Sequence, residues 1–344
     1  MIQQEHSTTN AGRLEYIDWM KALGIFIVVL GHQPLTSALT HDWIFSFHMP
    51  LFFFISGFLC KPVSNQGRYL VRNVRQLVLV IVPYYLVGMA FNLMQSYAFY
   101  RADFSVQRIV LGGFARLLRG ESTMGAMWFL LALFWMRIVY GWVAPRLGRW
   151  SCPAMLLMSV AVACVVWWSG FRWNYYQLTA FLLAFPFYCC GAWMRSADVV
   201  GRLRLRRRAW LYALGFLALS FALLPLTGSI NLNDLCVGQG FPLYYLAGMV
   251  GILFFLALAQ RLPRLRVVET ISEGTLVILG LHMMLIQVFK LVYKKLLLIN
   301  YPPPYMDLLS GVLISLFILV LLYFPVRWIL RSRRAWVRFL AGKR

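Results

Sequence analysis

Long apolar segments recur along the whole sequence and constrain its fold more than any other feature. Ten of them, each bounded by charged residues, Pro or Gly, occupy residues 16–32, 43–60, 77–99, 124–144, 153–169, 175–194, 209–226, 240–260, 271–293 and 307–330. About 20 apolar residues in a helix span the hydrocarbon core of a bilayer. The sequence therefore predicts an all-α integral membrane protein with a single bundle of about ten transmembrane helices.

The composition excludes a soluble domain. Hydrophobic residues make up 61% of the chain and charged residues 13%, against roughly 45–50% and 25% in soluble globular proteins. Because the apolar segments consume most of the length, we expect one membrane domain at residues 16–330. A cytoplasmic N-terminal tail is expected at residues 1–15, and a basic cytoplasmic tail at residues 331–344.

The basic residues act as topology signals. They give a net charge of +22, yet they lie in short clusters between apolar segments and not on one continuous surface, so we expect no nucleic-acid partner. Alternate connecting segments hold 24 of the 33 lysines and arginines on one side and 8 on the other. The positive-inside rule then places both termini in the cytoplasm. Three lysines, at positions 290, 294 and 295, go against this assignment.

The cysteines predict neither a disulfide framework nor a metal site. Nearly all six lie in or beside apolar segments, and they form no CxxC motif and no Cys/His spacing typical of zinc. We therefore expect no bound metal.

A lysine and a histidine in the first apolar segment are the leading functional candidates. Eleven helical steps of about 100° bring His32 within roughly 20° of the direction of Lys21, with a rise of about 16 Å between them. Ionisable groups inside spans usually face an interior cavity and mark function. Taken singly, Lys21 could be a snorkelling lysine that pairs with Asp18, and His32 a hydrogen-bonded structural histidine.

Other polar or aromatic residues in the apolar segments are weaker candidates, and the role expected for them is to line the substrate path: His48, Ser56, Trp128 and His282. His48 enters the second segment at a depth close to that of the first histidine, and His282 lies near the middle of the ninth. Each alone is more simply a structural histidine. Ser56 precedes a glycine and lacks a GxSxG or SxxK context, so packing is its simpler role. Trp128 is typical of a membrane interface, and Arg137 has no partner that the sequence can assign.

Three basic residues after the second apolar segment have a helical spacing. Arg68, Arg72 and Arg75 would point about 0°, 40° and −20° around a continuous helix. Guanidinium groups on one face match the phosphates of a nucleotide, which arginine binds through bidentate hydrogen bonds. The competing interpretation is that they set the topology or meet anionic lipid headgroups.

Together these residues form a familiar pattern. The chain resembles the bacterial acyltransferase family 3, and particularly its branch of fucose 4-O-acetylase-like enzymes. The shared features are Ile17-Asp18 through Lys21-Ala22-Leu23-Gly24, the ten-residue gap from Lys21 to His32, FHMPLFFFISGF from Phe47, Trp128-Phe129-Leu130, and the segment from Thr275 to His282. They follow the family's order across most of the chain. The basic-x10-His spacing with FFFISGF is specific, whereas WFL and the late histidine are less so.

The resemblance implies an enzyme of the bacterial inner membrane. Such an enzyme takes an acyl group, usually acetyl, from cytoplasmic acyl-CoA and transfers it to a sugar hydroxyl of a cell-surface glycan, such as lipopolysaccharide, or its lipid-linked precursor. By the family's motif, His32 would be the catalytic histidine and Lys21 its basic partner. Apart from the resemblance, we interpret Asp18 as the partner that keeps Lys21 charged; the alternative is a helix-end carboxylate, which is favourable near a helix N-terminus. The arginines from Arg68 to Arg75 match the donor-binding region. Acyl-CoA, the glycan acceptor and the lipid bilayer are the expected partners, with no bound cofactor; the oligomeric state is left open.

Two chemical routes and two other functions stay open at this point. His32 can act as a general base, because a neutral imidazole is available near pH 7, or it can carry the acyl group covalently. A glycolipid transporter or flippase would also have polar residues inside its spans, although no matching pair of Gly/Pro-broken segments appears in two halves. A membrane scaffold would give Lys21 and His32 no reason to share a face.

Overall fold

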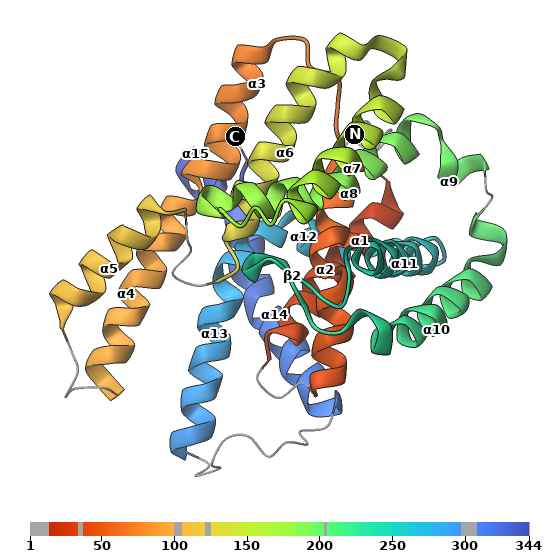
Figure 1. Ribbon diagram of the computed structural model, residues 1–344. Helices are drawn as coiled ribbons and strands as arrows, with labels where there is room; N and C mark the ends of the chain where they lie inside the picture. Colours follow the sequence, from red (N-terminus) through yellow and green to blue (C-terminus); the bar gives the residue numbers. More distant parts are fainter. Residues whose placement is uncertain are drawn as a thin grey trace, which may run out of the picture.

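The computed structural model describes residues 14–33, 37–99, 105–120, 125–202, 205–296 and 308–343. Helices form nearly all of this structure (Figure 1): α1 Glu15–Gly31, α2 Ala38–Phe58, α3 Gln66–Asn73, α4 Ile81–Phe99, α5 Val106–Leu118, α6 Trp128–Val143, α7 Ser151–Trp168, α8 Leu178–Ser196, α9 Val199–Arg202, α10 Ala209–Thr227, α11 Phe241–Ala259, α12 Arg266–Glu273, α13 Thr275–Leu296, α14 Leu308–Arg331 and α15 Ala335–Phe339. Short helical turns lie at η1 Val74–Leu79, η3 Ala144–Trp150, η4 Tyr175–Gln177, η5 Leu205–Arg208 and η6 Leu232–Asp234. Two short strands, β1 Ile230–Asn231 and β2 Cys236–Val237, pair antiparallel as a hairpin.

The helices agree with the predicted membrane architecture. A helix lies in each of the ten predicted apolar segments. Within the described ranges, eight helices are long and apolar enough to cross a bilayer. Helices α1 and α2 are not among the eight: α1 has 17 residues, and α2 carries His41, Asp42 and His48. The chain is thus a multi-pass helical membrane protein, while the count of ten spans and the cytoplasmic termini stay predictions.

Helix α2 lies at the centre of the bundle, in contact with α1, α8, α10 and α11. A Cβ atom at Gly57 would lie 1.9 Å from the carbonyl oxygen of Tyr188, and one at Gly191 would lie 2.1 Å from that of Phe54. Only glycine permits backbones this close, which is the small-residue packing typical of membrane helices. Helices α2 and α8 are therefore closely packed, and α2 also contacts α1.

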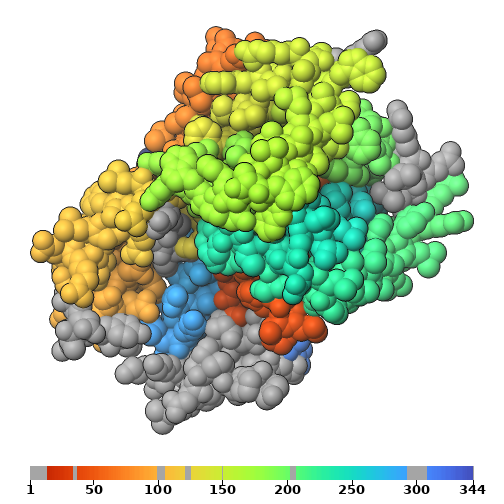
Figure 2. All heavy atoms as spheres, viewed as in Figure 1, coloured from red at the N-terminus to blue at the C-terminus, as the bar shows by residue number. Residues whose placement is uncertain are grey.

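The outer helices present apolar side chains that a bilayer would cover. Only 28% of the apolar 18-residue stretch of α10 is buried inside the protein, against 61% of that of α11. Figure 2 shows α4 and α5 at one side of the molecule and α10 at the opposite side. Large apolar residues on the outer helices, such as Leu214 and Phe324, are well exposed. Such apolar surfaces would promote aggregation in water. They are therefore suited to contact with lipid.

A wide helical turn joins α3 to α4, where the directions given above for the three arginines assume a continuous helix. Residues Val74–Leu79 are π-helical. Pro83 has no N–H to donate to the carbonyl of Leu79, and its ring crowds that carbonyl. A π-turn absorbs this disturbance within a helix. Arg75 lies in the turn, so its direction differs from that on an ideal α-helix.

The basic segment predicted at residues 331–344 packs back on the bundle as far as it is described. The hydroxyl of Tyr84 donates a hydrogen bond to the carbonyl of Leu340 at 2.7 Å. Val337 is fully buried, and Lys343 forms an ion pair with Glu273. In Figure 1 the C-terminus lies beside α15, close to α3. The end of the chain therefore forms part of the surface around the three arginines.

Candidate active site

Three histidines from distant parts of the sequence lie together. His32 follows the last residue of α1, His48 lies in α2 and His282 in α13. The ring centroids of His32 and His282 are 5.3 Å apart, and those of His32 and His48 are 6.3 Å apart. Both pairs are nearly perpendicular, and His48 and His282 are buried. The structure thus brings together all three histidines singled out in the sequence, with His32 in the middle.

The hydrogen bonds of the three rings define their tautomers. Nδ1 of His32 lies 2.8 Å from the carbonyl of Val28, and Nδ1 of His48 lies 3.0 Å from that of Ile44. Nδ1 of His282 lies 3.0 Å from two carbonyls of its own helix. Because a carbonyl only accepts, each neutral ring carries its proton on Nδ1. Nε2 of His32 therefore keeps its lone pair, as a general base requires.

His32 and His48 border a cavity of about 230 Å³, the histidine cavity. Trp128, at the first turn of α6, forms part of its wall. The cavity is lined by Val28, His32, His41, Phe45, His48, Met49, Pro50, Gly125, Ala126, Trp128, Ile230, Asn231, Leu232, Asn233, Tyr244, Leu279 and Met283.

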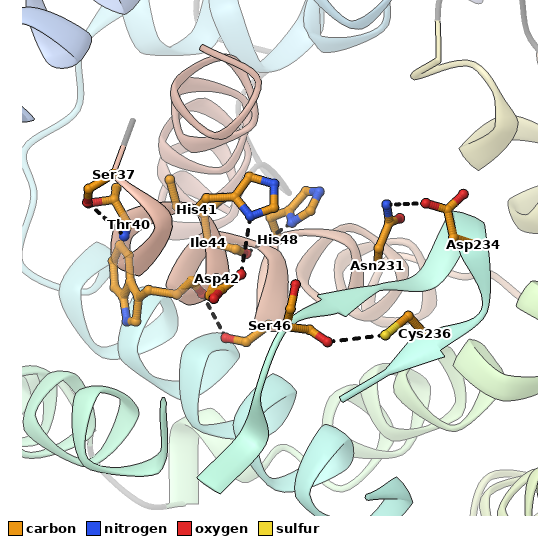
Figure 3. Close-up of polar contacts among 12 residues, drawn as sticks. Ser37, Thr40, His41, Asp42, Ile44, Ser46, His48, Asn231, Asp234 and Cys236 are labelled. Atoms are coloured by element: carbon orange, nitrogen blue, oxygen red, sulfur yellow. Dashed lines mark hydrogen bonds and ion pairs between the residues drawn. The ribbon is translucent and has the colours of Figure 1, made fainter. Parts of the chain in front are cut away.

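The hairpin and the start of α2 add polar residues to this cavity that sequence reasoning missed. Figure 3 shows the hairpin alongside the part of α2 that carries His41 and His48. Nδ2 of Asn231 donates to a carboxylate oxygen of Asp234 at 2.6 Å, and Asn233 also borders the cavity. The signal for these residues was the group of Asn231, Asn233 and Asp234 between two apolar segments. Their amides suit contacts with a polar, hydroxyl-bearing molecule.

Lys21 borders a second cavity, of about 280 Å³, the lysine cavity. It is lined by Lys21, Phe52, Ile55, Ser56, Leu59, Gln76, Leu77, Phe129, Leu130, Leu133, Arg137, Ser272, Glu273, Thr275, Leu276, Leu279, Ala341 and Gly342. Asp18, one turn before Lys21, accepts a hydrogen bond of 2.6 Å from the hydroxyl of Ser272. Asp18 therefore ties α1 to α12 at the edge of this cavity.

The structure shows a contact between Arg137 and Ser56 that the sequence could not assign. Nε and Nη2 of Arg137 donate to the hydroxyl oxygen of Ser56 at 3.2 and 3.1 Å. Arg137 thus has a partner, and Ser56 is a polar wall residue of the lysine cavity as well as a packing residue. The two residues are 81 positions apart, so no local pattern could reveal their contact.

Arg68, Arg72 and Arg75 border a third cavity, of about 520 Å³, the arginine cavity. It is lined by Gly67, Arg68, Val71, Arg72, Arg75, Gln76, Phe339 and Lys343. The Arg75 guanidinium lies 5.9 Å from the ring centroid of Phe339. The side-chain oxygen of Asn65 accepts from the Arg68 N–H at 2.9 Å and caps α3. The cavity therefore combines four cationic side chains from α3, the π-turn and the C-terminal segment.

The three cavities form a series. Gln76 borders both the arginine and lysine cavities. Among the described residues, Leu279 is the one that borders both the lysine and histidine cavities. Lys21 and His32 share a helix and both reach interior cavities, but about 16 Å of helix rise separates them. The structure therefore places them in two different cavities and not at one centre.

Within the described ranges, no three His, Cys, Asp or Glu side chains are arranged to hold a metal ion.

Comparison with known proteins identifies a family for the chain. A family model described as an acyltransferase domain matches residues 14–328. Searches of curated proteins and of solved structures found no significant match. The matched region covers most of the chain and contains the candidate residues from Asp18 to His282. The chain therefore belongs to the membrane acyltransferase family 3.

Proposed function

We propose that this acyltransferase moves a short acyl group, most simply acetyl, from cytoplasmic acyl-CoA to a sugar hydroxyl. The acceptor is a cell-surface glycan or its lipid-linked precursor, in the bacterial inner membrane, as the fucose 4-O-acetylase-like branch would imply. The observation that carries the proposal is the series of cavities, with arginines at one end and a histidine base at the other. Acyl-CoA enters as a substrate, and no other cofactor is required.

The arginine cavity supplies the donor end. The phosphates of CoA bind Arg68, Arg72 and Arg75, because guanidinium groups form strong bidentate hydrogen bonds with phosphate. The acyl-bearing arm then passes Gln76 into the lysine cavity. Lys21, about 16 Å of helix rise from His32, contributes its positive charge on this donor side, where it attracts the anionic donor.

The histidine cavity supplies the acceptor end. The acceptor hydroxyl lies at His32, and the amides of Asn231 and Asn233 contact its sugar ring. Nε2 of His32 takes the hydroxyl proton while the oxygen attacks the acyl carbonyl carbon. The new C–O bond forms, the C–S bond breaks, and the proton leaves with the CoA thiol. A general base of this kind contributes roughly 10²- to 10⁴-fold to the rate.

Purified protein with radiolabelled acetyl-CoA tests the proposal. The acceptor is a glycolipid fraction extracted from bacterial membranes, and the readouts are released thiol and label in the glycolipid. We expect both to depend on protein and on acceptor. Acceptor binding without thiol release or label transfer would instead favour a transporter.

A further inference from the structure

Leu279 lies where the lysine cavity and the histidine cavity meet. It lies in α13, and its carbonyl accepts from Nδ1 of His282 at 3.0 Å. It borders both the lysine cavity and the histidine cavity. With 7% of its surface exposed, it is buried where the two cavities meet.

The two cavities are stacked along the same helices. In α13, Leu276 borders the lysine cavity and Met283 the histidine cavity, with Leu279 between them. Along α1 the order is the same: Lys21 borders the lysine cavity, and His32, just after the end of the helix, borders the histidine cavity. Helices α2 and α6 also contribute residues to both cavities. Leu279 thus lies between two neighbouring cavities that are lined by the same helices.

We propose that Leu279 determines the size of the transferred acyl group. The inference rests on the proposed function, since it takes the donor to enter from the arginine cavity and the base to be His32. The thioester must pass the Leu279 side chain to reach Nε2 of His32. An acyl chain longer than acetyl then has to share the space that this side chain fills.

Close packing makes this position selective. Protein interiors have few voids, so an added methylene displaces neighbouring atoms. One methylene too many or too few in a hydrophobic pocket changes specificity by about 10- to 200-fold. Shortening Leu279 should therefore change the preference among donors more than the rate with acetyl-CoA.

The test compares Leu279→Ala with wild type on acetyl-, propionyl- and butyryl-CoA. We expect the ratio of kcat/KM for butyryl-CoA to that for acetyl-CoA to rise about tenfold or more. Leu279→Phe should lower transfer from all three donors. Leu319→Ala is the matched control, because Leu319 in α14 is equally buried at 7% and borders none of the three cavities. Its donor ratio should equal that of wild type.

The outcomes separate the two proposals. Wild-type protein that transfers no acyl group from any donor would refute the proposed function itself. Wild-type acetyl transfer with an unchanged donor ratio in a folded Leu279→Ala protein would refute the role of Leu279 alone. If Leu279→Ala does not accumulate, Leu279→Val removes one methylene and should shift the ratio in the same direction. An unchanged ratio in that variant would also overturn the inference.

Discussion

Replacing the arginines of the arginine cavity by glutamine tests where the donor binds. Arg72→Gln and Arg75→Gln keep a polar side chain but remove the positive charge and the planar fork that matches phosphate. A hydrogen bond to a charged group contributes about 1.5–3 kcal/mol, and every 1.4 kcal/mol is about a factor of ten. Both arginines are exposed, so water screens their charges. The lower value, about 1.5 kcal/mol, therefore applies. Each substitution should raise the KM for acyl-CoA about tenfold.

The assay is the initial rate of thiol release, measured against acyl-CoA and then against acceptor. The KM for acceptor should not change, because the acceptor is proposed to bind at the histidine cavity. Arg146→Gln is the control, since Arg146 is also exposed and lies outside the arginine cavity. Unchanged dependence on both substrates, or a loss of membrane insertion alone, would make these arginines topology signals.

Lys21→Ala should nearly abolish transfer and Lys21→Arg should retain it, because a positive charge is required in the lysine cavity; normal activity of the alanine variant would remove this role. A Ser37→Cys variant that also carries Cys236→Ser should react with an impermeant thiol reagent from outside the cell, and reaction only from the cytoplasm would reverse the predicted orientation. Gly57→Ala should lower the free energy of unfolding by about 1–3 kcal/mol through overpacking. Gly215→Ala should not lower it, because nothing lies within 4 Å of a Cβ atom at that position. Equal stability of the two glycine variants would contradict the close packing of α2 on α8.

Local constraints explain what the sequence could predict. Each span must satisfy its own backbone hydrogen bonds in lipid, so apolar length alone located a helix in every predicted segment. Helical geometry likewise placed Lys21 and His32 on one face, and both border interior cavities. Membership of the acyltransferase family followed from the same residues and is confirmed by the family match.

Packing between distant segments explains what the sequence could not predict. The contact of Asp18 with Ser272 joins residues 254 positions apart, and the position of Leu279 between two cavities depends on how α1, α2, α6 and α13 assemble. The hairpin strands have two residues each, too few for an alternating pattern. Its asparagines were therefore absent from the predicted site.

The central claim is that His32 is the base for acyl transfer. The most direct measurement is label transfer from acetyl-CoA to the glycolipid fraction by His32→Ala protein, after equal membrane insertion has been established. Loss of the base should lower the rate by at least roughly 10²-fold, while the KM for acyl-CoA should stay near its wild-type value because the arginine cavity is intact. Transfer at the wild-type rate would contradict the account.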